Sequence, residues 1–192
     1  MLTLLYIIRN DDVYLKQTLS HNLSLLSSYS DDIIVIDDGS VSDIKHYLTH
    51  HFPRCRYMKN SYEQGFSDSF NKVINVITND YVLYLEPSIR LDYLDIDACI
   101  TKMKLQSGFA MIFPIFNRKR LISNSQLTYL SVKSGFLHFD HVDYNYQYAD
   151  ERNSIVMSQA MMFDVQRLRF IGQFPTCYTY AFFSFADLMY RA

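Results

Sequence analysis

The stretch IIVIDDGSVSD, residues 33–43, decides how the rest of the chain is interpreted. Its first four residues are apolar and β-branched, and a short apolar run that ends at turn residues is typical of a strand buried on both faces of a parallel sheet. Such sheets bind ligands beyond the carboxyl ends of their strands, where Asp37 and Asp38 lie. Carboxylates suit sugar hydroxyls, base N–H groups or a metal ion. The stretch therefore predicts a nucleoside or metal site at one edge of a sheet.

Working outward from this stretch, the chain alternates strands and helices. Apolar runs predict strands at residues 3–8, 33–36, 54–58, 81–85, 109–116 and 154–163. Helical periodicity predicts helices at residues 13–26, 43–51, 66–77, 95–105 and 181–190. The alternation predicts an α/β fold with a mostly parallel central sheet and helices on both faces. Residues 117–153 show no clear period, and we expect an irregular insert there, either a loop or a pair of crossing strands.

Composition narrows the class of protein. The 192 residues are enough for one α/β domain, and we find no repeat or linker, so we expect a single domain over residues 1–192. The net charge of −2 argues against nucleic acid as the main partner. Three cysteines without a CxxC spacing exclude a disulfide framework or a zinc ribbon and indicate a reducing cytoplasm. The apolar N-terminus is too short to span a membrane, so we expect no transmembrane segment.

Polar residues follow the first four predicted strands. They are Arg9–Asn10, Asp37–Asp38, Lys59–Asn60 and Glu86, and parallel strands would bring them to one sheet edge. A dinucleotide-binding Rossmann domain needs GxGxxG after its first strand, where this chain has RNDD. The P-loop motif GxxxxGK[ST] and the glycine-rich basic loop of sugar-nucleotide pyrophosphorylases are also absent. These three classes of nucleotide-binding protein are therefore excluded.

With these motifs the chain resembles the family 2 glycosyltransferases, inverting enzymes with the GT-A fold. The matching segments are TLLYIIRN (3–10), IIVIDDGSVSD (33–43), NSYEQGFSDSFNKVI (60–74), YVLYLEPSIRLD (81–92) and IGQFPTCYTYAFFSFADLMYR (171–191). They cover essentially the whole chain in the family's order. The resemblance implies a GT-A-like, Rossmann-like fold, with a nucleotide-binding half at residues 1–90 and an acceptor-side half at residues 91–192.

The resemblance also implies substrates and binding residues. The donor would be a nucleoside-diphosphate sugar of the UDP or dTDP type, and the acceptor a glycan or a lipid-linked molecule. Asn10 would lie near the nucleoside, and Asp37 and Asp38 would face the base or ribose. Gly65 would let the chain pass close to the donor, and Asn71 matches an asparagine of the family's helix. We expect a cytoplasmic chain, either free or peripheral to the inner face of the membrane.

Two departures from the family pattern concern the chemical step. The family's metal-binding DxD-type motif is Glu86-Pro87-Ser88 here, and a neutral serine is a poor ligand for Mn²⁺ or Mg²⁺. The resemblance therefore implies weak metal binding through Glu86, or none. The family's acidic ED pair, which supplies the catalytic base, is replaced by Ser184 and Phe185, while Asp187 remains.

Other residues could compensate for the missing base. His138 and His141 belong to an HFDH cluster, and histidine is a competent base near neutral pH. Asp187 is the third candidate base, and the basic run RKR at residues 118–120 could hold a diphosphate without a metal. Two hypotheses follow: a glycosyltransferase, or a catalytically degenerate glycosyltransferase domain that serves as a nucleotide-binding or assembly module.

Overall fold

The computed structural model describes residues 1–30, 32–113, 116–117, 120–121, 127–133, 136–142, 154–155, 159–178 and 181–191. Side chains are described within residues 1–30, 32–113, 159–178 and 183–191. The first half contains β1 (Leu2–Ile8), α1 (Asp12–Leu26), β2 (Asp32–Asp37), α2 (Lys45–His51), β3 (Cys55–Lys59), α3 (Gly65–Ile74), β4 (Tyr81–Leu85) and α4 (Ile96–Leu105). The second half contains β5 (Ala110–Ile112), β6 (Phe116–Asn117), β7 (Arg120–Leu121), β8 (Leu127–Lys133), β9 (Phe136–Val142), β10 (Ser154–Ile155), β11 (Ala160–Asp164), α5 (Val165–Ile171) and α6 (Ala181–Arg191).

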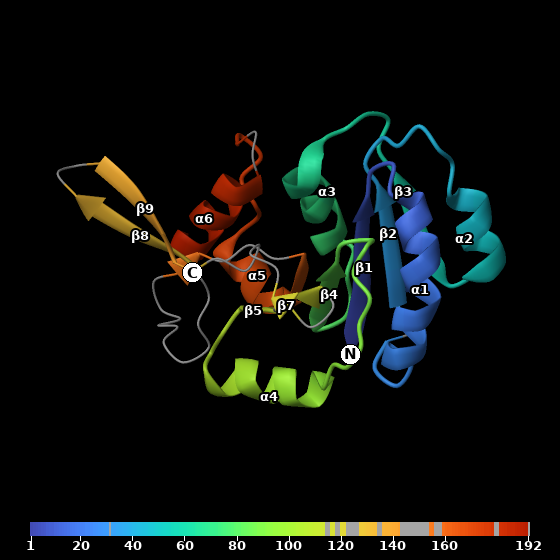
Figure 1. Ribbon diagram of the computed structural model, residues 1–192, viewed down its shortest axis with the longest axis horizontal. Coiled ribbons are helices and arrows are strands. Elements are labelled where there is room, and N and C mark those ends of the chain that lie inside the picture. The colour runs from blue at the N-terminus through green and yellow to red at the C-terminus, as the bar shows by residue number, and fades with distance from the viewer. Residues whose placement is uncertain are drawn as a thin grey trace.

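The main sheet has six strands in the order β3-β2-β1-β4-β11-β5. The strands β3, β2, β1 and β4 are parallel, and β11 runs antiparallel between β4 and β5. Helices lie on both faces of this sheet (Figure 1). The prediction of an α/β fold with a mostly parallel central sheet is therefore confirmed.

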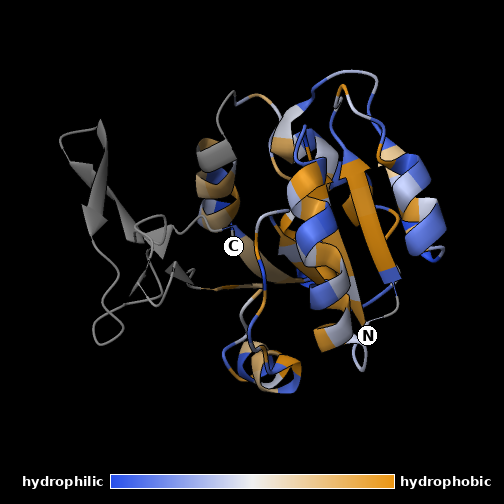
Figure 2. Ribbon diagram, turned by 45° about the vertical axis from the view of Figure 1, so that its right-hand side comes forward, coloured by the Kyte–Doolittle hydropathy of each residue, from blue (hydrophilic) through white to orange (hydrophobic). Residues whose placement is uncertain are grey.

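Successive side chains of a strand point to opposite faces of the sheet, and apolar residues form a hydrophobic core on each face. On one face Val35 and its neighbours pack with α1, α2 and α4, and on the other Ile34 and Ile36 pack with α3, α5 and α6. Both faces of β2 are thus buried, as the unbroken apolar run predicts. The strongly hydrophobic central strands are visible in Figure 2.

The insert at 117–153 contains paired strands. β8 and β9 form an antiparallel hairpin, β10 pairs with the other side of β8, and β6 pairs with β7. Figure 1 shows β8 and β9 extending away from the main sheet. Paired strands thus occur among the described residues of this region, and an irregular insert over residues 117–153 stays a prediction.

Several details differ from the sequence expectations. The runs at residues 109–116 and 154–163, each expected to form one strand, are divided between sheets, since β5 and β11 belong to the main sheet while β6 pairs with β7 and β10 pairs with β8. The helix expected at residues 66–77 ends at Ile74, because the backbone N–H groups of Val76 and Ile77 both donate to Val73 O and close the chain into a turn. The helix α5 was not expected. It begins after Asp164, whose carboxylate accepts a hydrogen bond from Arg167 N at 3.0 Å. No helix in the described part of the chain is long and apolar enough to cross a membrane.

Candidate functional site

Three loops meet at the carboxyl edge of β1, β2 and β3, and we call residues 9–12, 37–43 and 59–65 the polar corner. Asn10 joins the first loop to the second. Its N–H donates to Ser40 Oγ (2.9 Å), and its side-chain oxygen accepts from Val41 N–H (3.0 Å). Asn10 has a φ of 59°, a left-handed conformation that asparagine tolerates better than most residues. The residue type therefore matches both the backbone and the contacts of this loop.

Asp37 lies fully buried at the end of β2. One carboxylate oxygen accepts from Ser40 N–H (2.7 Å); the other accepts from Tyr57 Oη–H (2.8 Å) and lies 3.5 Å from Lys59 Nζ. Burial alone would raise the pKa of Asp37, but the hydrogen bonds from Ser40 and Tyr57 and the charge of Lys59 outweigh it and lower the pKa. Asp37 is therefore a buried, ionised carboxylate.

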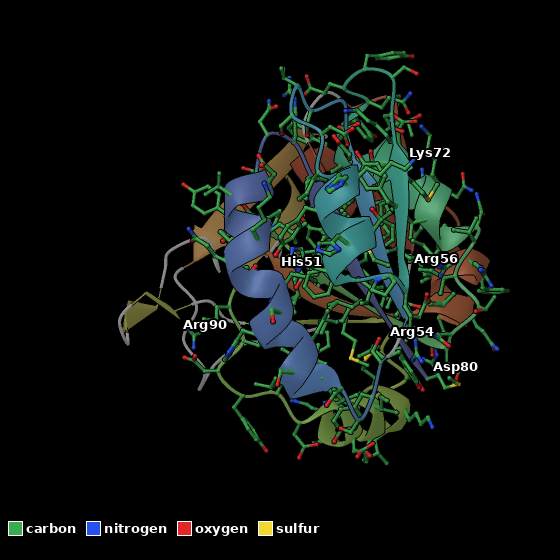
Figure 3. The ribbon with its side chains drawn as sticks, turned by 90° about the vertical axis from the view of Figure 1, so that its right-hand side faces the viewer. His51, Arg54, Arg56, Lys72, Asp80 and Arg90 are labelled. Atoms are coloured by element: carbon green, nitrogen blue, oxygen red, sulfur yellow. The ribbon has the colours of Figure 1, made fainter. Side chains whose placement is uncertain are left out.

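Asp38 joins the second loop to the start of α3. Its carboxylate accepts from Asn60 Nδ2 (2.7 Å), Gln64 N–H (2.8 Å) and Gly65 N–H (2.8 Å). The last two donors lie at the N-terminus of α3, where backbone N–H groups lack helical partners and favour an anion. Lys72, labelled in Figure 3, donates to Asn60 Oδ1 (2.6 Å) and to Gln64 Oε1. Asp38 and Lys72 are thus linked through the Asn60 amide and through Gln64, whose backbone N–H binds Asp38 and whose side chain binds Lys72.

Two glycines shape the polar corner, both with positive φ. A Cβ on Gly39 would lie 2.6 Å from backbone atoms of Tyr62 and Glu63, so only glycine lets the second and third loops approach so closely. An ion pair between Arg9 and Glu63 holds the first and third loops together. At Gly65, by contrast, no atom lies within 4 Å of an added Cβ, so the space beside the start of α3 is open.

Asn71 lies apart from this network. Its Nδ2 donates to Phe174 O (2.8 Å) and its Oδ1 accepts from Phe174 N–H (3.0 Å), which fastens α3 to the segment before α6. The structure therefore brings Asn10, Asp37, Asp38 and Gly65 to one edge and gives Asn71 a contact in the protein interior. Nucleotide binding by these five residues stays a prediction.

Glu86 lies half-buried at the end of β4, beside β11. Its backbone N–H donates to Gln159 O (2.7 Å). The pKa of Glu86 is raised, mainly by burial and to a lesser extent by the negative charge of Asp11. A hydrogen bond with the Gln159 side chain lowers this pKa but does not cancel the increase. Two carboxylates thus repel one another where β1 and β4 end.

The metal ligands expected from the family do not assemble around Glu86. Ser88 is exposed and neutral, and no group of three His, Cys, Asp or Glu side chains suited to a metal occurs within the described residues. Mn²⁺ and Mg²⁺ prefer several carboxylate or carbonyl oxygens. The described donor set does not fit either ion, and the metal role of Glu86 stays a prediction.

The loop after β4 is nevertheless held firmly by α1. Thr18 Oγ1 donates to Pro87 O (2.7 Å) and Asn22 Nδ2 to Ile89 O (2.9 Å), while Asn22 Oδ1 accepts from Leu91 N–H (2.9 Å). These contacts were not predicted from the sequence. Thr18 and Asn22, four residues apart, interrupt the apolar face of α1, and this pattern could have indicated that α1 binds a neighbouring loop.

The family's base positions lie in the interior of the protein. Ser184 is fully buried and donates to Pro175 O (2.8 Å). Phe185 is 1% exposed, and its ring centroid lies 4.9 Å from that of Phe174 and 5.3 Å from that of Phe66. Neither side chain can accept a proton from a bound substrate.

Asp187 is engaged within α6. Its carboxylate accepts from Arg191 Nε (2.6 Å), and the same guanidinium donates to Ile171 O (2.9 Å) and Gln173 O (2.8 Å). Asp187 thus orients an arginine that satisfies carbonyls at the end of α5. A role of Asp187 as base stays a prediction.

The histidine candidates lie on the β8–β9 hairpin. His138 pairs with Ser131 and His141 with Thr128 across the two strands, but their side chains are outside the described residues. Of the basic run, Arg120 begins β7, and residues 118–119 are outside the described residues. The catalytic role of these histidines stays a prediction.

Solved structures with this fold are glycosyltransferases. Mannosyltransferase PcManGT from Pyrobaculum calidifontis, in complex with GDP-Man and Mn²⁺, superposes with a TM-score of 0.68 at 14% identity over 99% of this chain and 50% of that chain. TarS 1–349 of S. aureus in complex with UDP superposes with a TM-score of 0.66 at 10% identity over 99% of this chain and 54% of that one. Its complex with UDP-GlcNAc gives 0.61 at 10% identity over 91% and 48%. The chain thus spans about half the length of these structures, and its fold is that of the GT-A glycosyltransferases.

A family model matches the segment that builds the polar corner. Residues 4–87 match the model of glycosyl transferase family 2, the family that the sequence of this segment resembles. No curated protein matches the chain in sequence.

Proposed function

We propose that the polar corner binds a nucleoside-diphosphate sugar and that the chain transfers the sugar to a glycan or a lipid-linked acceptor. The observation that carries this proposal is the interlocking of three loops through Asn10, Asp37 and Asp38 beside the open space at Gly65. Parallel sheets bind ligands at this edge. The similar solved structures are complexes with GDP-Man, UDP and UDP-GlcNAc, and we infer a UDP- or dTDP-type donor here.

Asp37 and Asp38 would recognise the nucleoside in different ways. Asp38 holds the start of α3 in place, so its contribution is to shape the corner. A carboxylate has about four acceptor positions, and Asp37 uses only some of them internally. Because Asp37 has no exposed surface, its direct contact with a base N–H or a ribose hydroxyl requires the segment at Ser40 and Val41 to open.

Sugar transfer with inversion needs a base for the acceptor hydroxyl and positive charge near the departing diphosphate. We propose His138 or His141 for the base, since the family's base positions are buried and Asp187 is paired with Arg191. The resemblance that places the donor at the polar corner does not extend to these histidines. Their contribution therefore has to be tested separately from donor binding.

A second candidate function is a nucleotide-binding or assembly module without catalysis. The burial of Ser184 and Phe185 and the neutral Ser88 favour it, because base and metal ligand are both replaced. Donor binding would be kept in this case, since the polar corner is intact. The two functions differ only in turnover.

Calorimetric titration tests both functions. UDP, dTDP and their sugar conjugates would be titrated with and without Mn²⁺, and donor cleavage would then be assayed with and without candidate acceptors. Binding with turnover supports the transferase, and binding without turnover supports the module. The absence of binding to every nucleotide would contradict both.

A pair of matched variants locates the donor. Asp37→Asn is expected to lower nucleotide affinity roughly tenfold or more, because a buried charged hydrogen bond contributes about 1.5–3 kcal/mol. Asp43→Asn, an exposed aspartate later in the same segment, should leave affinity unchanged. Unchanged affinity in Asp37→Asn, with the fold intact by circular dichroism, would place the donor elsewhere.

A further inference from the structure

The outer face of α2 carries an unusual set of imidazoles, His46, His50 and His51. The helix is held to the sheet by Ile44 and Leu48, which are buried in the core shared with α1 and α4. His46 and His50 lie on the opposite side of the helix, since each is separated from Leu48 by about half a turn. Both are exposed, and Figure 3 views the molecule from this side, with α2 in the foreground.

His46 and His50 are four residues apart on one helical face. Side chains at this spacing are neighbours, with Cβ atoms about 5–6 Å apart. Their ring centroids lie 6.4 Å apart with the planes tilted by 43°. Among the described residues, none forms a hydrogen bond with either ring. Both imidazoles are therefore available to a ligand from solvent.

Two imidazoles at this spacing suit one divalent metal ion. Metal–nitrogen bonds are about 2.0–2.1 Å long, so two ligating nitrogens around one ion are roughly 3 Å apart. His46 and His50 are exposed, and rotation of their side chains between staggered rotamers brings two ring nitrogens to this separation. His50 lies in the last turn of the helix, where the partial negative charge of the helix C-terminus favours a cation, whereas His46 is the second residue of the helix.

We propose that His46 and His50 form a bidentate surface site for a borderline transition-metal ion such as Ni²⁺ or Zn²⁺, with water completing the coordination. No third ligand-type side chain converges on a metal position in the described part of the chain, so the site is a pair and not a closed cage. Imidazole pairs bind Ni²⁺ and Zn²⁺ in preference to Mn²⁺, which stands at the weak end of the divalent series. The site is therefore chemically distinct from any Mn²⁺ or Mg²⁺ bound near Glu86, and it does not depend on the proposed function.

Adjacent His51 supplies a matched control. Its ring faces Tyr47, with ring centroids 4.7 Å apart, and it also lies 4.7 Å from the His50 ring in an edge-to-face arrangement. His51 is one residue from His50, so its Cα–Cβ bond points about 100° around the helix, although its ring lies nearer to the His50 ring than the His46 ring does. It is exposed like the proposed ligands, and its contact with Tyr47 distinguishes it from them.

The test is a calorimetric titration of the untagged chain with NiCl₂ and ZnCl₂ at pH 7.5, where imidazoles are mostly neutral. One Ni²⁺ site is expected, with no comparable Mn²⁺ binding. His46→Ala and His50→Ala should each lower the Ni²⁺ association constant roughly 100-fold, at the upper end of the 10–100-fold loss that follows removal of a partner around a metal ligand. His51→Ala and the double variant His138→Ala/His141→Ala should stay within about threefold of the parent chain.

A second set of variants distinguishes the loss of a metal ligand from unfolding of α2. His46→Gln and His50→Gln keep a good helix former at each position and should lose Ni²⁺ binding while retaining the parent circular dichroism spectrum. Retention on an immobilised Ni²⁺ column should fall in parallel. The proposal is overturned if Ni²⁺ does not bind, if binding survives both His46 and His50 variants, if it is lost equally in His51→Ala, or if Mn²⁺ binds as tightly.

Discussion

At the scale of single residues, Asp38 joins the second loop of the polar corner to the third. Its three hydrogen bonds join β2 to the amide of Asn60 and to two backbone N–H groups at the start of α3. The side chain is buried, so little water can replace it. The second aspartate of the DDGS stretch is therefore a structural residue as much as a candidate for donor recognition.

Asp38→Ala is expected to lower the free energy of unfolding by about 2–4 kcal/mol, because it leaves buried or half-buried donors without their charged acceptor. Asp43→Ala removes one exposed hydrogen bond, to Lys45 N–H, and should cost less than about 1 kcal/mol. Urea unfolding followed by circular dichroism measures both. Equal losses in the two variants would contradict the role given to Asp38.

Asp37 makes stability depend on pH in a definite direction. Its folded-state pKa is lowered, so its contribution is fully present above the unfolded value of about 4 and is lost as pH falls through the folded value. The difference in unfolding free energy between the parent chain and Asp37→Asn should therefore be large at pH 7 and shrink below about pH 4. Denaturant unfolding between pH 3 and 7 measures this difference.

Glu86 serves as a control, because its contribution to stability should depend on pH in the opposite direction. Its pKa is raised by burial and by Asp11, so its contribution is present below the unfolded value and is lost as pH rises through the folded value. Glu86→Gln should therefore be at least as stable as the parent chain at pH 7. If both variants show the same pH trend, the assignment of opposite shifts is wrong.

At the scale of elements, α5 and α6 are joined through one guanidinium. Arg191 donates to carbonyls at and just beyond the end of α5 while Asp187 holds it from within α6. Gly172 makes this possible, since an added Cβ would lie 2.8 Å from the guanidinium. Asp187 and Leu188 match the Asp-Leu pair of the family's terminal helix. In this chain Asp187 holds Arg191, which binds the end of α5 to α6.

Asp187→Asn separates this structural use from catalysis. We expect a loss of about 1 kcal/mol in unfolding free energy, because the ion pair is about a third exposed, and no change in nucleotide affinity. Any turnover of the parent chain should persist within a few-fold. Loss of turnover by several orders of magnitude with unchanged stability would instead identify Asp187 as the base.

At the scale of the whole molecule, an aromatic cluster binds the second half of the chain to the first. The cluster packs with ring centroids 4.9–6.3 Å apart and consists of Phe66 and Phe70 of α3, Phe163 of β11, Phe174 of the segment before α6, and Phe185 of α6. All of these rings except that of Phe66 are fully buried. The position where the family carries an acid is thus part of the core.

Phe185→Glu is expected to destabilise the chain by more than about 3 kcal/mol, because it buries an unpaired charge among these rings, and not to create activity. Phe185→Leu keeps an apolar side chain and should cost less than about 2 kcal/mol. Thermal unfolding and donor turnover measure the two effects. A stable Phe185→Glu variant with increased turnover would show that this position faces the substrate.

Much of the fold could be predicted from local patterns. The strand at residues 81–85 has the expected bounds, and the buried strand before Asp37 and the helices of the first half lie within a few residues of their predictions. Apolar periodicity reflects burial on one helix face or on both sheet faces, and those are local constraints. The helix α5 was not predicted, although Asp164 is a typical N-cap residue and the apolar residues Val165 and Leu168 are three positions apart.

The amino-acid sequence is enough to predict the class of fold and the polar edge of the sheet, because these depend on residue types that follow one another along the chain. The contacts of the polar residues could be known only from the folded chain. Asp38 meets Gly65 across 27 positions and Asn71 meets Phe174 across 103, and the insertion of β11 between β4 and β5 is equally non-local. Such pairings depend on which elements pack together, and short-range periodicity carries no information about them.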